Sequence, residues 1–293
     1  MSELTQGIID MHIHTGPSVA KRSVDGIEMF KMAKEAGYKG FAMKEHYLPT
    51  QFEATLLNKH YRTSESDPIV YGVYCINGST GLFNLIGIDA AVTAGAKIIV
   101  FPTVTSKNHI DHHQGKFPGS GAMTVDEAPL VYVDDKGELS KECVAVLEYI
   151  AARPELIIMT GHGTVPEIDA LINKAVETGC KKIIVNHPQF HIGATIEDMV
   201  RWAKKGCYIE INACVFEKTT PNIAKERLPI SLAKEMIDAC GIDNIIVDSD
   251  LGQTNTSLPV IGLSNFLEAL IEGGVTREQV DIATKINPAK LVG

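Results

Sequence analysis

The chain repeats one unit along its length: a helix-like segment, a stop at glycine, a polar residue, and a short run of apolar and β-branched residues. Glycine suits the left-handed residue that ends a helix, and it follows helix-like segments at positions 37, 95, 179, 206 and 241. Because the apolar runs are nearly continuous, they predict parallel strands buried on both faces. We expect eight such strands, at residues 7–12, 40–44, 70–76, 97–102, 156–160, 182–186, 207–211 and 244–248.

Helical periodicity follows each run, and we expect helices at residues 24–36, 51–61, 83–94, 140–152, 165–178, 195–205, 222–239 and 258–272. Eight strands alternating with eight helices in 293 residues predict an α/β fold, a single-domain (β/α)8 TIM barrel over residues 1–293, for which about 250 residues are typical. The excess length falls at residues 103–139, after the fourth strand, where we expect an inserted loop with a small hairpin turned at 135–137. A loop of this length is usually functional, often as a lid.

Composition narrows the class of protein, since 45% hydrophobic and 22% charged residues are ordinary for a globular chain. No run approaches about 18 uninterrupted apolar residues, and the N-terminus lacks a basic region followed by an apolar one, so we expect no membrane span, no signal peptide and a cytoplasmic location. The six cysteines form no CxxC pair and are expected to be buried free thiols. A net charge of −9 argues against a nucleic-acid surface. The expected partner is a small-molecule substrate, and a homo-oligomer stays open.

Two histidines, His12 and His14, end the first apolar run at a spacing of two residues. Successive side chains of a strand point to opposite faces, so both histidines project to the same side and can bind one metal ion. The alternative is a strand end with two incidental histidines. Because the motif is short, the ends of the other runs decide between these interpretations.

Active sites of (β/α)8 barrels lie at the carboxyl ends of the strands. These ends carry Lys44, Glu45 and His46 on the second strand, His162 on the fifth, His187 on the sixth, and Asp248 and Asp250 on the eighth. Each alone has a simpler explanation, as a turn residue or a helix cap. Their joint occurrence at one barrel mouth favours one or two divalent metal ions, with zinc or manganese preferred because the ligands mix imidazole with carboxylate.

This pattern resembles the amidohydrolase superfamily of metal-dependent hydrolases: His-x-His on the first strand, a histidine on the fifth and on the sixth, and Ser-Asp on the eighth. The resemblance covers nearly the whole chain, and residues 43–49 and 250–253 are similar to an uncharacterised branch. The resemblance implies two metal positions, one held by His12, His14 and Asp250 and the other by His162 and His187. It also implies that Asp250 takes the proton of the attacking water.

Superfamily members with two metal ions usually take a bridging carboxylate or carboxylated lysine from the fourth strand, and residues 99–106 offer neither. The second strand offers Lys44 and Glu45 instead, but neighbouring residues of a strand face opposite ways. Strand parity pairs Lys44 with His46, so we expect these two at the barrel mouth, with Lys44 at the metal site and His46 in a catalytic role. Lys44 is then either a carbamate or a buried amine that is salt-bridged to a site aspartate.

Depth along the strand separates the two aspartates of the eighth strand. Asp250 and His162 each lie three residues beyond the last apolar residue of their strands, so we expect them at one level. Asp248 then lies about 6–7 Å deeper in the barrel. We therefore expect Asp250 to be a metal ligand and the general base, and Asp248 to be a neighbouring or substrate-facing acid that pairs with Lys44.

Other candidates lie near the mouth. His109, shortly after the fourth strand, is an additional candidate ligand or substrate contact, against the alternative of a solvated loop. Cys214 could be a nucleophile, but no base is evident for it and a packing role is favoured. Lys21 and Arg22 follow the first strand and could bind an anionic group of the substrate, with solvated surface charge as the default.

Hydrolysis is the leading functional prediction: a metal lowers the pKa of bound water from about 15.7 to about 7, a carboxylate takes the proton, and an ester, lactone, amide or phosphoester bond is cleaved. The alternative within catalysis is a phosphoesterase of the polymerase-and-histidinol-phosphatase type, which residues 10–15 and 44–46 resemble. That family implies seven strands and an additional histidine, and none occurs between His14 and His46. A decarboxylase or lyase on the same barrel, and a non-catalytic binding protein that contains a metal, are further alternatives.

Overall fold

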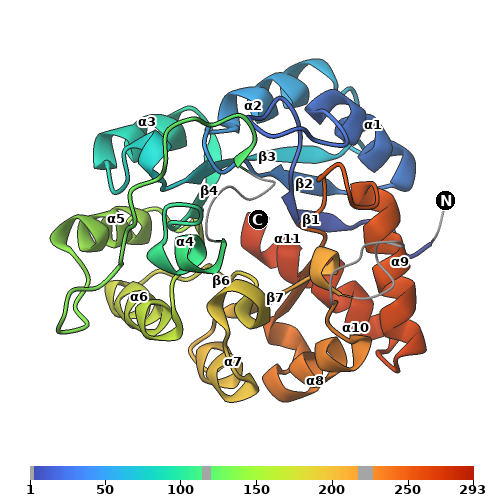
Figure 1. Ribbon diagram of the computed structural model, residues 1–293. Coiled ribbons are helices and arrows are strands. Elements are labelled where there is room, and N and C mark those ends of the chain that lie inside the picture. The colour runs from blue at the N-terminus through green and yellow to red at the C-terminus, as the bar shows by residue number, and fades with distance from the viewer. Residues whose placement is uncertain (1–2, 114–119, 217–226) are drawn as a thin grey trace.

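The computed structural model describes residues 3–113, 120–216 and 227–293. Its strands form one parallel sheet in chain order, arranged as a ring (Figure 1). They are β1 Ile9–Ile13, β2 Gly40–Met43, β3 Ile69–Cys75, β4 Ala96–Val100, β5 Ile157–Met159, β6 Ile183–Val185, β7 Tyr208–Asn212 and β8 Ile245–Asp248. Beyond the end of β8, the N–H of Asp250 donates to the carbonyl of His12 and the N–H of His14 donates to that of Leu251, each over 2.8 Å, which closes the ring. The predicted (β/α)8 barrel is confirmed.

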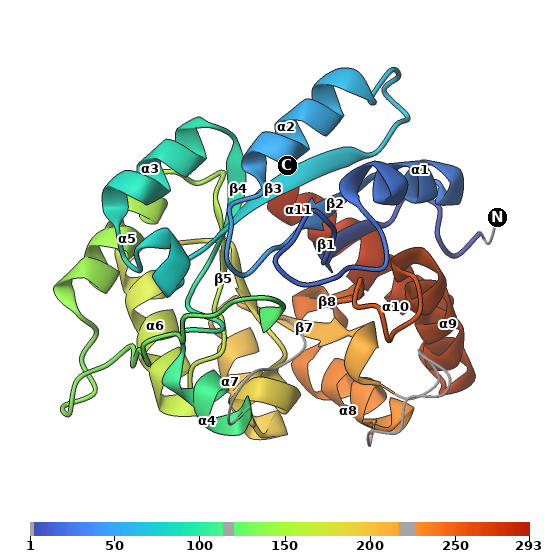
Figure 2. The same ribbon diagram turned by 45° about the horizontal axis from the view of Figure 1, so that its top comes forward.

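Helices follow the strands and surround the ring (Figure 1): α1 Gly26–Ala36, α2 Gln51–His60, α3 Leu85–Thr93, α5 Lys141–Ala151, α6 Val165–Thr178, α7 Ile196–Ala203, α8 Ile230–Cys240 and α9 Pro259–Glu272. Figure 2 shows α6, α7 and α8 in succession along one side of the ring. Side-chain caps mark where α1, α3, α5 and α7 begin. Before α7, for example, Thr195 accepts a hydrogen bond from the N–H of Asp198, and the Asp198 carboxylate accepts one from the N–H of Thr195 over 2.9 Å.

One predicted helix, 222–239, begins later than expected. Residues 222–226 lie outside the described residues, and α8 starts only at Ile230. Leu228 forms a parallel bridge with Phe216, and its N–H donates to the carbonyl of Val215 over 3.0 Å. Because a residue before proline avoids the helical region, Pro229 keeps Leu228 extended and the helix begins after it.

Residues 103–139 contain a helix that the sequence analysis did not predict, α4 Lys107–His113. Farther along, Leu130 forms a parallel bridge with Ser106. The chain then turns at residues 134–137, and Val133 forms an antiparallel bridge with Leu139. Residues 114–119 lie outside the described part of the chain, and a role of this segment as a lid stays a prediction.

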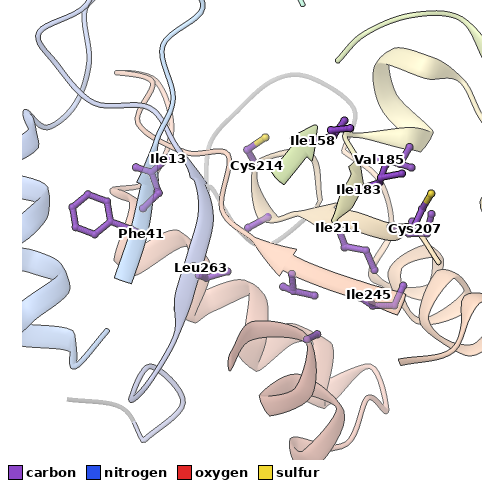
Figure 3. Close-up of a cluster of buried hydrophobic side chains, with 14 of the residues drawn as sticks. Ile13, Phe41, Ile158, Ile183, Val185, Cys207, Ile211, Cys214, Ile245 and Leu263 are labelled. Atoms are coloured by element: carbon purple, nitrogen blue, oxygen red, sulfur yellow. The ribbon is translucent and has the colours of Figure 1, made fainter. Parts of the chain in front are cut away.

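Alternation of side chains along the strands divides the apolar core into two layers. The inner layer fills the ring and includes Ile98, Val100, Ile157, Met159, Ile184 and Ile246. Leu291 joins it from the C-terminal helix α11 (Asn287–Val292), which follows α10 (Arg277–Asp281) and lies at the centre of the ring in Figure 1. Neither of these two short helices was predicted. The outer layer lies between strands and helices, and Figure 3 shows part of it, including Ile158, Ile183, Val185, Ile211, Ile245 and Leu263.

All six cysteines are free and buried, as the sequence predicts. Burial raises the pKa of the Cys75, Cys143 and Cys207 thiols to about 12, so these thiols stay protonated at neutral pH. Among the described helices, none is long and apolar enough to cross a membrane.

The position directly before His162 requires glycine, which is Gly161 in this chain. Its φ is 74°, and a Cβ there would overlap the carbonyl oxygens of Phe101 and Pro102. Gly179 also has a positive φ, 99°, but nothing lies within 4 Å of its Cβ position. We expect Gly161→Ala to lower the free energy of unfolding by about 1–3 kcal/mol more than Gly179→Ala, because only Gly161→Ala adds steric overlap to backbone strain. Chemical denaturation measures both losses, and equal losses would contradict this account.

Candidate metal centre and active site

A buried polar layer continues the inward-facing rows of the barrel interior. Ala42, Ile184 and Ile246 belong to the inner layer, and Tyr208 packs on it. Each is followed two positions later by a polar residue: Lys44, Asn186, Asp248 and Glu210, respectively. Because strand side chains alternate, each of these polar residues lies on the same side as the apolar residue before it. None of the four is more than 1% exposed. The apolar interior of the barrel is therefore covered by polar groups at the carboxyl ends of the strands.

Five histidines surround this mouth, and all five were predicted as site residues. Their ring centroids form a closed circuit, with separations of 5.3 Å for His12–His14, 5.0 Å for His14–His46, 6.1 Å for His46–His162, 5.2 Å for His162–His187 and 5.1 Å for His187–His12. All are buried, with exposures from 0% to 7%. We call His12, His14, His46, His162 and His187 the histidine circle. The barrel thus brings together residues from the ends of β1, β2, β5 and β6.

The first two histidines direct the same ring atom toward one carboxylate. Nδ1 of His12 lies 3.1 Å from Oε1 of Glu210, and Nδ1 of His14 lies 2.9 Å from the carbonyl oxygen of Lys44. Their Nε2 atoms lie 3.2 Å and 3.0 Å from Oδ1 of Asp250. One ligand atom from each of His12, His14 and Asp250 can be chosen so that all three lie within 4.8 Å of one another. The three residues named for the first metal position are therefore grouped as a metal ion requires.

The charge states of this group suit a divalent cation. Burial lowers the pKa of His14 to about 3, with a smaller effect from the charge of Arg22, and burial also lowers the pKa of His187. Burial by itself raises the pKa of Asp250, but His12, His187 and His14 outweigh it and hold that pKa well below its ordinary value. Burial thus favours neutral imidazoles at His14 and His187, and these face an ionised carboxylate at Asp250.

Backbone strain marks two of these residues. His187 has a φ of 36° and Asp250 a φ of 47°, and left-handed backbone is unusual for residues other than glycine. Such a conformation costs about 1–3 kcal/mol and persists only where the surroundings enforce it. Each residue lies two positions beyond the end of its strand, and the left-handed backbone turns its side chain into the mouth.

The second predicted metal position and His109 are also brought together. Nδ1 of His187 lies 2.7 Å from Oδ1 of Asn212, and Nδ1 of His162 lies 2.9 Å from Nδ1 of His109. His109 comes from α4 and is 3% exposed, so it belongs to the buried site and not to a solvated loop. His46, between His14 and His162 in the circle, has its Nδ1 2.9 Å from Oγ1 of Thr103.

Strand parity places Lys44 and Glu45 as expected, but one predicted contact is wrong. Glu45 contacts Arg22 and Ser18, and Lys44 is buried with no hydrogen-bond partner for its Nζ among the described residues. The expected pairing of Asp248 with Lys44 therefore does not form, and neither does a salt bridge from Lys44 to another site aspartate. Burial, followed by the charges of Glu210 and Asp10, raises the pKa of Asp248 well above its ordinary value, which disfavours the anion that such a pair needs.

Glu210 on β7 is a site residue that the sequence pattern did not predict. It is fully buried, accepts hydrogen bonds from Nδ2 of Asn186 over 3.1 Å and from the N–H of His187 over 3.2 Å, and holds Nδ1 of His12. It also forms a second group of candidate ligands with His12 and His187. The available signal was an acidic residue inside the apolar run 207–211, on the same face of the strand as Asn212.

Cys214 contacts the site but does not have the properties of a nucleophile. Its Sγ donates to Oδ2 of Asp250 over 3.1 Å. Burial, and then the charge of Asp250, raises the pKa of the thiol well above its ordinary value. A protonated thiol beside a carboxylate is a hydrogen-bond donor, which agrees with the packing role favoured from the sequence.

Glu210→Gln keeps the size of the side chain but removes the charge that orients His12. Because groups that hold metal-bound histidines typically contribute 10–100-fold in affinity, we expect zinc affinity to fall by about that factor. Competition with a fluorescent zinc chelator measures it. Glu167→Gln is the matched control, since Glu167 is also buried but accepts from the N–H groups of Tyr132 and Thr164. Unchanged affinity in Glu210→Gln would refute the orienting role.

Solved hydrolase structures share this fold. An amidohydrolase from Pseudomonas aeruginosa has a TM-score of 0.64 and 13% identity, covering 99% of this chain and 97% of its own. A mutant organophosphorus hydrolase from Deinococcus radiodurans has a TM-score of 0.56 and 12% identity, covering 100% and 95%. The phosphotriesterase homology protein from Escherichia coli, with phosphate in its active site, has a TM-score of 0.54 and 11% identity, covering 99% of each chain. At these identities the likeness concerns the fold, and it confirms the barrel that the amidohydrolase resemblance implies.

The sequence itself matches a family that spans most of the candidate site. No curated protein matches the chain. A family described as being of unknown function, DUF6282, matches residues 7–210, from two residues before β1 to Glu210. This range includes the whole histidine circle, whereas Asp250 lies beyond it. The chain belongs to the DUF6282 family.

Proposed function

We propose that this protein is a metal-dependent hydrolase that cleaves an ester, lactone, amide or phosphoester bond of a small molecule. The observation that carries the proposal is the convergence of Nε2 of His12 and Nε2 of His14 on one oxygen of Asp250. Both Nδ1 atoms are engaged by other groups, which is the usual arrangement of histidines that bind metal. Hydrolase structures with the same fold support the reaction class.

The residues fit a divalent metal ion. His12 Nε2 is a buried nitrogen without a hydrogen-bond partner in the described part of the chain, and it lies beside a carboxylate oxygen. His12, His14 and Asp250 would hold one ion and His162 and His187 a second, with zinc or manganese suited to this mixture of imidazole and carboxylate. A bound ion of this kind lowers the pKa of water and polarises a carbonyl or phosphoryl oxygen.

Asp250 is the general base in this proposal. Its side chain is 14% exposed, whereas Glu210 and Asp248 are fully buried, so Asp250 is the acid that can reach a water in the mouth. Cys214 and His14 engage its two oxygens and hold the carboxylate in place. Asp250 takes the proton from the attacking water and can return it to the leaving group. Thr103 orients the ring of His46 through its Nδ1, and we assign His46 to a contact with the oxygen of the scissile group.

Lys44 is assigned to the metal site as a carbamate. Its buried Nζ has no ion-pair or hydrogen-bond partner among the described residues, and such an amine is costly to bury as a cation. The neutral amine attacks CO2, a nitrogen–carbon bond forms, and one proton is released, which leaves a carboxylate at the same place. This group would supply the bridge that the fourth strand lacks.

The phosphoesterase alternative of the polymerase-and-histidinol-phosphatase type is less well supported. It implies seven strands, and the barrel has eight. A non-catalytic binding protein is disfavoured by Asp250, because a purely structural metal site has no need of a partly exposed acid.

Asp250→Asn and Asp248→Asn test the assignment of the base. Loss of a general base typically costs 10²–10⁴ in rate, so we expect Asp250→Asn to lower kcat by about that factor. Asp248 accepts a hydrogen bond from Asn212 over 2.6 Å and is fully buried, so Asp248→Asn should keep a measurable fraction of the activity. Metal content is measured for both variants. The reverse order of activities, with metal retained in both, would exchange the roles.

Removal of metal tests the reaction class and the carbamate together. We expect protein purified without chelator to contain at least one equivalent of divalent metal, and chelation to abolish hydrolysis. Reconstitution with zinc should restore more activity, and bind more metal, in buffer with bicarbonate than in CO2-depleted buffer. Metal below about 0.2 equivalents with no uptake on titration would refute the metal centre. Equal recovery in both buffers would refute the carbamate alone.

A further inference from the structure

A buried ion pair beside the histidine circle has no part in the proposed reaction. Nη2 of Arg22 lies 3.2 Å from Oε2 of Glu45, and both side chains are only 3% exposed. Removing two charges from water is expensive, and their mutual attraction repays it only with good geometry and further hydrogen bonds. The simplest explanation is a clamp between the loop after β1 and the end of β2, but that explanation uses only part of the guanidinium.

The Arg22–Glu45 pair lies next to the residues of the proposed reaction. Arg22 forms an antiparallel bridge with Gln253, and the N–H of Ser23 donates to the carbonyl of Gly252 over 2.8 Å. Arg22 therefore lies against the loop that follows Asp250, and Glu45 lies between Lys44 and His46 in the chain. Burial lowers the pKa of His14 and of His46, and the charge of Arg22 contributes to both shifts, which agrees with a guanidinium close to both rings.

The guanidinium keeps unused donors. Its Nε donates to Oγ of Ser18 over 3.2 Å and its Nη2 donates to Glu45. The hydrogen bonds of the guanidinium to described residues thus come from Nε and Nη2. A guanidinium carries five N–H groups in a rigid plane that matches the oxygens of a carboxylate or phosphate. A clamp accounts for Nε and Nη2, and Nη1 remains for a ligand.

A neighbouring cavity has the opposite character. It measures about 340 Å³, and its lining includes His109 of the candidate site, His113, the apolar Val104 and Met123, Tyr47, and the acids Asp126 and Glu127. The N–H of Tyr47 donates to Oε1 of Glu45 over 3.4 Å, so the cavity adjoins the buried pair. Two acids in its lining disfavour a second anion there, and its apolar residues suit a neutral or apolar portion of a ligand.

We propose that Arg22 is an anion-binding subsite and that the substrate carries a carboxylate or phosphate group close to the scissile bond, with its uncharged remainder in the cavity. This inference rests on the proposed function, because the scissile bond is taken to lie at His12, His14 and Asp250. Glu45 and Ser18 hold the guanidinium rigid, so that little entropy is lost when an anion binds. Lys21, the exposed basic neighbour, is assigned no such role.

Two hydroxamates test the subsite in the zinc-loaded full-length protein. Succinic monohydroxamate carries a carboxylate, and its carboxamide analogue is neutral, while both present the same metal-binding group. Isothermal titration should show the charged probe binding the wild type at least about 10-fold more tightly, as expected for one charge-assisted hydrogen bond. Arg22→Gln should lose this preference, and the matched control Lys21→Gln should keep it.

A second variant guards against misfolding. Arg22→Gln leaves Glu45 buried without its partner, so Arg22→Gln/Glu45→Gln removes both charges together, with melting temperature and circular dichroism as checks. Equal binding of the two probes to the wild type would overturn the subsite while leaving the metal centre intact, and so would a preference that survives in either Arg22 variant. Failure of both probes to bind the wild type after incubation with zinc would instead overturn the accessible metal centre of the proposed function.

Discussion

The alternation of side chains in a closed ring of short parallel strands is the constraint on which this structure depends. Inward positions must be filled, because a ring of eight strands leaves room only for packed side chains. Ile184 and Ile246 fill the interior of the ring below the mouth, and two residues later the same inward-facing rows present Asn186 and Asp248. One geometric rule thus produces both the apolar core and the polar layer on which the histidine circle lies.

The mouth concentrates ionisable groups in a place where charge is costly. Glu210 and Asp248 are fully buried, Lys44 is 1% exposed, and these groups are not simply paired with one another. Glu210 is fully engaged by His12, Asn186 and His187, whereas Nζ of Lys44 and Oδ2 of Asp248 have no hydrogen-bond partner in the described part of the chain. Since buried polar groups are nearly always satisfied, these atoms indicate chemistry and not stability.

Preorganisation is the common feature of the site. Glu210 sets the ring of His12, the carbonyl of Lys44 sets His14, and Asn212 sets His187. The left-handed backbone of His187 and Asp250 adds strain that the surrounding barrel must maintain. Groups held in this way lose little freedom when a ligand or a transition state forms, and such residues are therefore found on rigid strand ends.

The sequence by itself determined the barrel and most of the mouth. Repeated apolar runs predict parallel strands, and polar groups after those runs predict His12, His14, His46, His162, His187 and Asp250 at one face, because the ends of parallel strands meet there. Strand parity alone predicted that Lys44, and not Glu45, lies at the mouth. These predictions depend only on local periodicity, which a chain carries in its residue order.

Only the tertiary structure decided which groups touch. The contact of His12 with Glu210 joins residues 198 positions apart, and it requires the ring to close with β7 and β8 in register beside β1. The absence of an Asp248–Lys44 pair, the arrival of His109 from the unpredicted helix α4, and the burial of Arg22 with Glu45 likewise depend on how loops fold over the mouth. Local sequence cannot encode these contacts, because each is set by the distance between strands and loops that meet only after the barrel has closed.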